Sequence, residues 1–373
     1  MTLAADGSAG QAAAGARQAG RLADPGMGPG TDPRIDPRLL AALTAFGLDA
    51  AAAPPPLTRD TPTEQLCEFI GQAEAGFEGL YEALPNELPG DDDDNVTYSR
   101  ESIQGIDGNE ITLHIFRPAG VVGSLPCTVY LHGGGMTILK ADNKVHRQWS
   151  RDLAETGMVV VSVDFRNGYT AAGLNPFPAG LNDCTSAVRW IGSHRDELGI
   201  GKIVLQGESG GGNLVLATTL RAKQDGQLDD IDGVYAMVPY ISGGYAWDQA
   251  RKLRELPSLV ENDGYFIECQ IMDLLVSIYD PTGANAENPL CWPYFAKVTD
   301  LEGLPPHVIS ANELDPLRDE GVAYYRKLLG AGVPVVGRIN LGLVHAADSI
   351  FRQALPDVYA ATVGDIRRFA YSL

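Results

Sequence analysis

The sequence predicts an α/β protein built on a mostly parallel, doubly wound β-sheet, and two observations lead to this prediction. Short, almost continuously apolar runs recur after residue 125, among them PCTVYLHG, MVVVSVDFR, KIVLQGES, GVYAMVPYI and PPHVISANE. Such runs are typical of parallel strands that are buried on both faces. Helical stretches at about 144–156, 178–197, 211–226 and 318–331 separate them, and this alternation predicts helices on both sides of the sheet.

The first hundred residues differ in composition from the rest. Residues 1–35 are rich in glycine and alanine and have too little apolar surface to offset the entropy of ordering, so we expect a flexible tail. Within 36–95, apolar residues recur at spacings of three and four along PTEQLCEFIGQAEAGFEGLYEAL, which indicates an amphipathic helix. Next, VTYSRESI and EITLHIFRP predict an antiparallel pair of strands joined by a turn at Asp107-Gly108.

One interval interrupts the alternation of strands and helices. Residues 241–290 are rich in aromatic side chains and stand where a short connection would suffice. Insertions of this length in a compact domain more often have a function than not, and lids are the usual case. We therefore expect an α/β core over 96–240 and 291–373, with the helices of 36–95 and the insertion forming a cap.

Composition and charge exclude several classes of function. The 373 residues contain 28 Lys and Arg against 48 Asp and Glu, a net charge of −20, which argues against nucleic acid or an anionic membrane surface as a partner. The excess acid is explained by solubility or, alternatively, by a field that disfavours anionic substrates. The five cysteines are scattered without CxxC spacing, which predicts free thiols, no metal site and a cytoplasmic location. No transmembrane segment or signal peptide is expected.

A candidate nucleophile lies in the segment Gly207-Glu208-Ser209-Gly210-Gly211, which fits the pattern G-x-S-x-G. An apolar strand precedes it and a helix follows, which is the context that a nucleophile elbow requires. Small flanking residues allow a tight, strained turn that exposes the hydroxyl of Ser209. The alternative is a glycine-rich helix start that binds an anion or packs closely.

A serine hydroxyl needs a neighbouring base to remove its proton. His114 and His307 fall within strands, and His146 and His194 fall on helices expected at the surface. His345 instead follows the last strand in VPVVGRINLGLVHAAD, at the carboxyl edge of the sheet where such sites gather. We therefore predict that His345 is the base.

The base in turn needs a carboxylate to orient it. Asp315 in SANELDPLRDEG follows the strand PHVISA and precedes a helix, again at the carboxyl edge. Asp319 and Glu313 are rival candidates, but Pro316 fixes a turn directly after Asp315. The order Ser209, Asp315, His345 along the chain is the order typical of this kind of fold.

A device for stabilising negative charge on a carbonyl oxygen is also present. His132-Gly133-Gly134-Gly135 follows the strand CTVYL, and glycines let backbone N–H groups approach a substrate closely. Such donors lower the barrier by about 3–4 kcal/mol each. Alone, the four residues are only a flexible loop, but upstream of G-x-S-x-G they become specific. Gly210, directly after the serine, supplies a further N–H group.

Taken together, HGGGM, GESGGGNL, NELDPLRDEG and GLVHAAD resemble the hormone-sensitive-lipase-like family of α/β-hydrolase esterases, from about residue 95 to the C-terminus. The resemblance implies an α/β-hydrolase fold with a helical cap and no cofactor. It also implies a triad of Ser209, Asp315 and His345, with Gly133, Gly134 and Gly210 as oxyanion donors. Many family members have Asp-Ser-Ala where this chain has Glu208-Ser209-Gly210.

The predicted function is hydrolysis of small-molecule carboxylic esters through an acyl-enzyme. A lactonase, an amidase or a phthalate-ester hydrolase would use the same triad, and the family also includes hormone receptors that have lost the histidine. The candidate substrate-binding residues are Phe77, Tyr81, Met136, Trp247, Tyr265 and Phe266, which would be explained equally well as cap core. The physiological substrate and the oligomeric state are not predicted.

Overall fold

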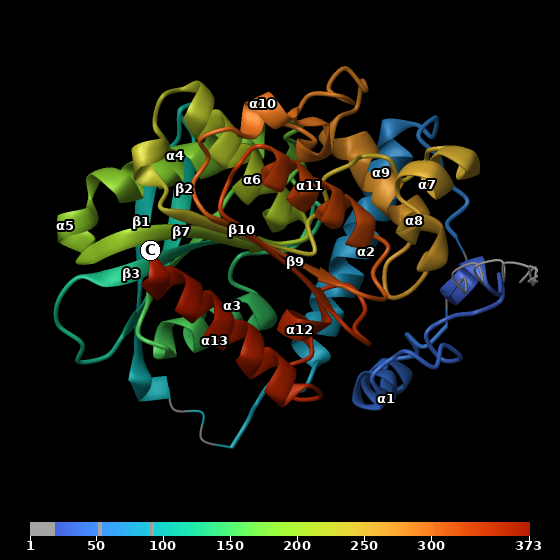
Figure 1. Ribbon diagram of the computed structural model, residues 1–373, viewed down its shortest axis with the longest axis horizontal. Coiled ribbons are helices and arrows are strands. Elements are labelled where there is room, and N and C mark those ends of the chain that lie inside the picture. The colour runs from blue at the N-terminus through green and yellow to red at the C-terminus, as the bar shows by residue number, and fades with distance from the viewer. Residues whose placement is uncertain (1–18, 51–53, 90, 92) are drawn as a thin grey trace, which may run out of the picture.

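The computed structural model describes residues 19–50, 54–89, 91 and 93–373, and within these residues eight strands form one sheet in the order β1-β2-β4-β3-β7-β8-β9-β10. The sheet runs through the middle of the molecule (Figure 1). Its strands are β1 (Val96–Gln104), β2 (Glu110–Pro118), β3 (Leu125–Leu131), β4 (Val159–Asp164), β7 (Ile200–Glu208), β8 (Gly233–Met237), β9 (His307–Asn312) and β10 (Val335–Asn340). A separate small hairpin joins β5 (Tyr169–Thr170) to β6 (Gly173–Leu174).

The pairing of the strands confirms the prediction of a mostly parallel sheet with an antiparallel start. β1 pairs antiparallel with β2, and β2 pairs antiparallel with β4, whereas all pairs from β4 to β10 are parallel. The chain passes from β3 to β4 on one side of β3, and β7 lies on the other side. The connections after β3 and β7 therefore diverge, which leaves a crevice at the carboxyl ends of these strands.

Helices cover both faces of the sheet, because the buried strands are apolar on both faces. In Figure 1, α4, α6 and α11 lie above the sheet, and α3 and α13 lie below it. The helix predicted over 178–197 is divided at His194 into α4 and α5. The helices of the core are α3 (Lys144–Glu155), α4 (Ala179–Ser193), α5 (Arg195–Leu198), α6 (Gly210–Gln224), α10 (Val298–Leu301), α11 (Arg318–Gly330), α12 (Ala347–Ile350) and α13 (Pro356–Ser372). Short 3₁₀ turns are η1 (Gly20–Leu22), η2 (Asp93–Asn95), η3 (Leu228–Asp230) and η4 (Pro293–Phe295).

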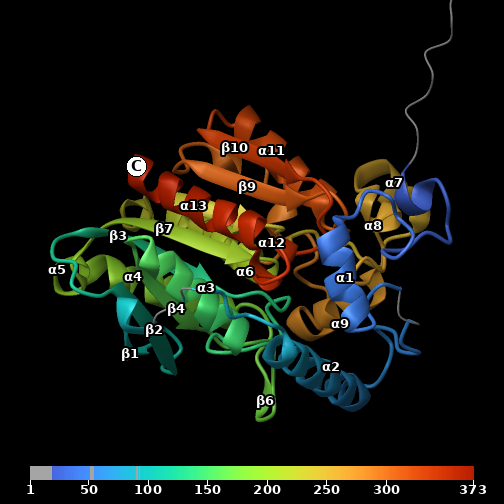
Figure 2. The ribbon, with the colours of Figure 1, turned by 90° about the horizontal axis from the view of Figure 1, so that it is seen from below.

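Two segments far apart in the sequence meet beyond the carboxyl ends of the parallel strands. Figures 1 and 2 show the N-terminal helices and the helices of the 241–290 insertion gathered at the same end of the molecule, with α2 packed against α9. The helices are α1 (Pro37–Ala45), α2 (Thr63–Ala83), α7 (Gln249–Glu255), α8 (Ser258–Glu261) and α9 (Cys269–Tyr279). Leu66 and Ile70 form the buried apolar side of α2, as the helical spacing predicts.

The prediction of a flexible tail over 1–35 is wrong for residues 19–35, and residues 1–18 lie outside the described part of the chain. Asp32 is 3% exposed, accepts a hydrogen bond from the Tyr265 hydroxyl at 2.8 Å and pairs with Arg34 at 2.7 Å. Arg34 also pairs with Glu261 of α8 at 2.7 Å. The segment is therefore held by ionic and hydrogen-bonding contacts, which compensate for the small apolar surface on which the prediction was based.

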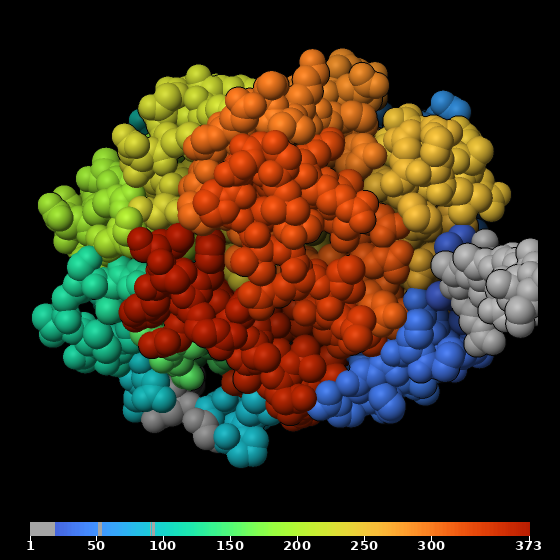
Figure 3. Space-filling view, in the orientation of Figure 1, coloured from blue at the N-terminus to red at the C-terminus, as the bar shows by residue number. Residues whose placement is uncertain are grey.

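The N-terminal segment also contacts the C-terminal part of the chain. Asp36 caps α1 by accepting the Arg38 N–H, and its own N–H donates to the Gly342 carbonyl at 2.9 Å. Arg38 pairs with Asp357 at the start of α13 at 2.6 Å. Figure 3 shows the blue N-terminal residues lying against the red C-terminal ones on the same face. The N-terminal helices are therefore attached to the core independently of the insertion.

One buried cation fastens the segment between α2 and β1 to the core. Arg352 is 5% exposed, and its guanidinium group pairs with Asp152 of α3 and with Asp91, each at 2.6 Å. It also donates to the carbonyl of Asn86 at 2.6 Å. Three parts of the chain therefore meet at this side chain.

Replacing Arg352 by alanine should lower the free energy of unfolding by about 3 kcal/mol, because the buried carboxylate of Asp152 would lose its cation. Urea denaturation measures this change. The control is Arg254→Ala: the Arg254 side chain is 65% exposed beside Glu255, so its loss should change the free energy by less than about 0.5 kcal/mol. Equal effects of the two substitutions would contradict this account of Arg352.

Candidate active site

Ser209 occupies the sharp turn between β7 and α6 that the sequence predicts. Its backbone angles are φ 56° and ψ −118°, a conformation that a residue with a side chain adopts only under constraint from its surroundings. The constraint comes from close packing of backbone around the turn, which the flanking glycines allow because they have no side chain. A Cβ atom at Gly211 would lie 1.8 Å from the Leu131 carbonyl oxygen, and one at Gly207 would lie 2.6 Å from the same atom. The end of β3 therefore packs directly against the turn.

Replacing Gly211 by alanine should lower the free energy of unfolding by at least about 2 kcal/mol, because the new methyl group overlaps with backbone that cannot move independently. The matched control is Gly76→Ala in α2, where a Cβ atom meets nothing within 4 Å. That change should leave stability unchanged or raise it by about 0.5–1 kcal/mol, since alanine favours a helix over glycine. Thermal and urea unfolding of both variants test the comparison, and a harmless Gly211→Ala would contradict it.

His345 and Asp315 come together at the carboxyl edge of the sheet. Asp315 follows β9, His345 follows β10, and His345 Nδ1 lies 2.8 Å from Asp315 Oδ2. The other carboxylate oxygen of Asp315 accepts the Leu317 N–H at 2.8 Å, which fixes the orientation of the carboxylate. A proton on Nδ1, donated to Asp315, leaves the Nε2 atom of the neutral ring with a lone pair.

The two rival carboxylates are directed elsewhere. Asp319 accepts the Ser258 N–H at 2.7 Å and pairs with Arg318 at 2.9 Å. Glu313 accepts the Gly342 N–H at 2.9 Å. Of the three candidates, Asp315 is the one that contacts His345.

The glycine loop after β3 lies against the Ser209 turn. Gly134 and Gly135 have φ of 102° and 59°, and a Cβ atom at Gly210 would lie 2.7 Å from the Gly135 nitrogen. The expectation that Gly133 serves as an oxyanion donor needs correction, because its N–H donates to Glu208 Oε1 at 2.7 Å. The sequence places Glu208 beside Ser209 but does not reveal that its side chain reaches across to β3.

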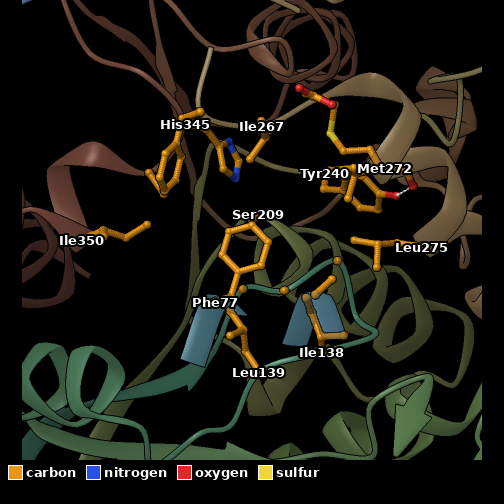
Figure 4. A pocket seen from close by; sticks show the side chains of 18 of the residues that line it. Phe77, Ile138, Leu139, Ser209, Tyr240, Ile267, Met272, Leu275, His345 and Ile350 are labelled. Atoms are coloured by element: carbon orange, nitrogen blue, oxygen red, sulfur yellow. Dashed lines mark hydrogen bonds between the residues drawn. The ribbon is translucent and has the colours of Figure 1, made fainter. Parts of the chain in front are cut away.

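A cavity of about 260 Å³ lies at this site, and Ser209, His345 and the glycine loop all line it (Figure 4). Its walls come from three parts of the chain: the N-terminal helices, the core and the insertion. Within the described part of the chain, no arginine or lysine lines it. The apolar lining includes Phe77, Leu80 and Tyr81 of α2, Ile138, Leu139 and Ile350 of the core, and Ile267, Ile271, Met272 and Leu275 of the insertion.

Three of the six predicted substrate-binding residues line this cavity: Phe77, Tyr81 and Phe266. Three do not. Met136 directly follows the glycine loop and is buried in the core, and Tyr265 is buried with its hydroxyl donating to Asp32. Trp247 packs against Tyr294 and Phe295, and the Arg251 guanidinium stacks 3.6 Å from its ring centroid. The aromatic content of the insertion therefore serves its own packing as much as the cavity.

Residues at the start of α9 that line the cavity are not among the predicted site residues. Glu268, Ile271, Met272 and Leu275 stand at spacings of three, one and three, which places them on one side of a helix. That spacing in ECQIMDLL is a usable signal. The candidates predicted in the insertion are instead all aromatic: Trp247, Tyr265 and Phe266.

Burial controls the protonation of the groups beneath the glycine loop. Burial raises the pKa of Glu208 to about 8 and lowers the pKa of His146 to about 4 and that of His132 to about 3. The expectation of a surface position for His146 is wrong: it is 2% exposed and stacks on His132 with ring centroids 5.2 Å apart. The sequence of α3 is mostly polar, so its composition does not reveal that one side of the helix, including His146, is buried.

The described residues show neither a metal-binding cluster nor a membrane-spanning helix. No group of three or more histidine, cysteine, aspartate or glutamate side chains there is arranged to hold a metal ion. No helix among them is long and apolar enough to cross a bilayer.

Comparison with known proteins agrees with this geometry. The family described as having the α/β hydrolase fold matches residues 128–349, which is more than half of the chain. The chain belongs to this α/β hydrolase family. The resemblance to hormone-sensitive-lipase-like esterases is thereby confirmed at the level of fold and family.

Among solved structures, this α/β hydrolase is similar to brefeldin A esterase, a bacterial homologue of human hormone-sensitive lipase. The TM-score is 0.93 and the identity 58%, over 94% of this chain and 97% of the other. The esterase Est22 is 37% identical over 91% of this chain and 98% of its own, with a TM-score of 0.79. The carboxylesterase NlhH of Mycobacterium tuberculosis is 32% identical over 63% of this chain and 70% of its own.

Proposed function

We propose that this α/β hydrolase is a serine carboxylesterase in which Ser209 is the nucleophile, His345 the base and Asp315 the orienting acid. The observation that carries the proposal is the 2.8 Å contact between His345 Nδ1 and Asp315 Oδ2 beside a cavity that Ser209 also lines. The esterase names of the related proteins support the reaction class. The roles proposed for Ser209, His345 and Asp315 rest on their positions in this structure and on the known chemistry of such side chains.

The reaction proceeds in two halves. Ser209 Oγ attacks the ester carbonyl carbon while His345 Nε2 takes the hydroxyl proton, and Asp315 stabilises the imidazolium that forms. The bond to the alcohol oxygen then breaks, the alcohol leaves with that proton, and an acyl-enzyme remains. Water, deprotonated by His345, attacks the acyl carbon and releases the acid and free Ser209.

Negative charge develops on the carbonyl oxygen in both halves. With Gly133 engaged by Glu208, the backbone N–H groups of Gly134, Gly135 and Gly210 are the candidates to stabilise it. All three belong to the segments in contact at the Ser209 turn, and the first two line the cavity. Donors that are fixed before the reaction cost no reorganisation when the charge appears.

The cavity favours neutral, apolar substrates. Its lining is mostly aliphatic and aromatic, it includes the carboxyl groups of Glu208 and Glu268, and the described chain contributes no lysine or arginine to it. An ester that also carries a free carboxylate would enter without a counter-charge, at a desolvation cost. A neutral lactone or diester fits the same description, whereas a phthalate monoester does not.

We further propose that segments 36–95 and 241–290 act as a cap that excludes water and selects the substrate. Phe77 and Leu275 support this role, because they reach the cavity from α2 and α9 respectively. A non-catalytic receptor on this fold is the rival function, and the intact contact between His345 and Asp315 argues against it. The cytoplasmic location stays a prediction, consistent with the five free thiols.

Ser209→Ala and His345→Ala should each lower kcat for a neutral p-nitrophenyl ester by at least about 10³-fold, because members of a triad act as a unit. Asp315→Asn should cost about 10³–10⁴-fold by favouring the wrong tautomer of the imidazole. The matched control is Asp319→Asn, whose carboxylate faces Ser258 and Arg318, and it should cost far less. Near-normal turnover by Ser209→Ala, or a reversed order of the two aspartate variants, would overturn the assignment.

Replacing Phe77 or Leu275 by alanine should raise kcat/KM for bulky esters relative to an acetate ester, because each substitution enlarges the cavity without touching the triad. Trp247→Ala is the control, since Trp247 packs away from the cavity against Arg251. It should leave the ratio unchanged. The measurement is the ratio of kcat/KM for a long-chain and a short-chain p-nitrophenyl ester in each variant. A shift in Trp247→Ala alone would contradict the cap.

A further inference from the structure

The side chain of Glu208 is a carboxyl group built into the wall of the cavity, directly before Ser209 in the chain. It is 4% exposed. Its Oε1 atom accepts the Gly133 N–H at 2.7 Å and the Tyr130 hydroxyl at 2.9 Å. Its Oε2 atom is buried and receives no hydrogen bond from the described part of the chain. The reaction outlined above makes no use of this group.

The groups around Glu208 carry no positive charge at neutral pH. Tyr81 of α2 and Tyr130 of β3 face it, and burial raises the pKa of each hydroxyl far above neutrality. His146 of α3 has its Nε2 atom 3.7 Å from Oε1, and its Nδ1–H donates to the Lys140 carbonyl at 2.7 Å. Burial lowers the pKa of His146 to about 4, so this ring is neutral.

The remaining facing groups do not supply a cation either. His132 at the end of β3 has a pKa lowered to about 3 by burial. Asp348 of α12 is a second buried acid, and its charge would repel a charge on Glu208. Within the described residues, Glu208 has no ion pair with an arginine or lysine. Burial without a counter-charge raises its pKa to about 8, and the carboxyl group is therefore mostly protonated at neutral pH.

The neutral carboxyl group of Glu208 lies where it can hold the glycine loop in place. Gly133 begins the loop whose next two residues, Gly134 and Gly135, line the cavity beside Ser209. The hydrogen bond from Gly133 to Glu208 connects the start of this loop to the last residue of β7. Ser209 is the next residue in the chain. The hydrogen bond therefore fixes the distance between the nucleophile and the N–H groups of the loop.

We propose, building on the esterase function above, that Glu208 is a positioning residue that holds the glycine loop in register with Ser209 while uncharged, and that its ionisation suppresses the reaction. The sign follows from electrostatics. A carboxylate at this place would lie in the same poorly solvated wall as the developing oxyanion, and like charges repel strongly where water is excluded. Activity should therefore fall as the pH rises through the titration of Glu208.

The test is the pH profile of kcat/KM for a neutral p-nitrophenyl ester, corrected for spontaneous hydrolysis. The natural protein should lose activity above pH of about 8 by at least about tenfold. Glu208→Gln keeps an acceptor for Gly133 but cannot ionise, so it should retain activity within about fivefold at pH 7 and lack the alkaline fall. Glu208→Ala removes the acceptor and should lower kcat by at least about tenfold while KM changes by less than about threefold.

Glu320→Gln is the matched control. Burial raises the pKa of Glu320 to about 8 as well, but its carboxyl group accepts the Ile241 N–H and the Tyr245 hydroxyl and does not line the cavity. This variant should keep the alkaline fall. A fall that persists in Glu208→Gln, disappears in Glu320→Gln or is absent from the natural protein would overturn the proposal, as would full activity of Glu208→Ala.

A second measurement separates this proposal from the esterase assignment. Infrared difference spectra should show a protonated carboxyl band that titrates near pH 8 in the natural protein and in Ser209→Ala, and that is reduced in Glu208→Gln. Absence of this difference would overturn the neutral state of Glu208 whatever the enzyme hydrolyses. Normal turnover by Ser209→Ala would instead overturn the esterase mechanism and leave the band unaffected.

Discussion

The contact between the carbonyl oxygen of Leu131 and the backbone at Gly211 is the constraint on which the rest of the site depends. It brings the end of β3 against the turn from β7 into α6, at a separation that no side chain could tolerate. Two loops that diverge from neighbouring strands are thereby joined at one point. This contact sets the position of the Ser209 turn against the end of β3, and the hydrogen bond from Gly133 to Glu208 then ties the glycine loop to the same turn. The cavity is lined by both segments.

The 241–290 insertion is hydrogen-bonded to Asp315, the acid of the proposed triad. Asn262, just after α8, donates its amide N–H groups to the carbonyls of Asp315 and Glu313, each at 3.1 Å. Next to it, Glu261 pairs with Arg318 at 2.8 Å and with Arg34 of the N-terminal segment at 2.7 Å. The insertion, the N-terminal segment and the loop that orients His345 thus form one connected unit. The insertion therefore contacts the backbone of Asp315, the residue that orients His345, through the Asn262 side chain.

The parts of this molecule that the sequence predicts are those with a local signal. Apolar runs and helical spacing identify the strands and most helices, and the positions of Asp315 and His345 after successive strands place them at one edge. Contacts between segments have no such signal. The engagement of Gly133 by Glu208, the burial of His146 and the ion pairs that hold residues 19–35 depend on side chains that meet only after folding. The position of Trp247 outside the cavity lining is a further case, because the sequence does not distinguish an aromatic residue that lines a cavity from one that packs within the insertion.

The absence of lysine and arginine from the described lining of the cavity has a consequence for the end of the catalytic cycle. Hydrolysis of a neutral ester creates a carboxylic acid that ionises at neutral pH, inside a protein with a net charge of −20. Nothing cationic in that lining retains the new anion, and the surrounding field drives it outward. The lining therefore offers apolar contacts to the neutral ester and no counter-charge to the ionised acid. We therefore expect the ionised acid product to bind the cavity less tightly than the neutral ester, whereas the alcohol product keeps its apolar contacts with the lining.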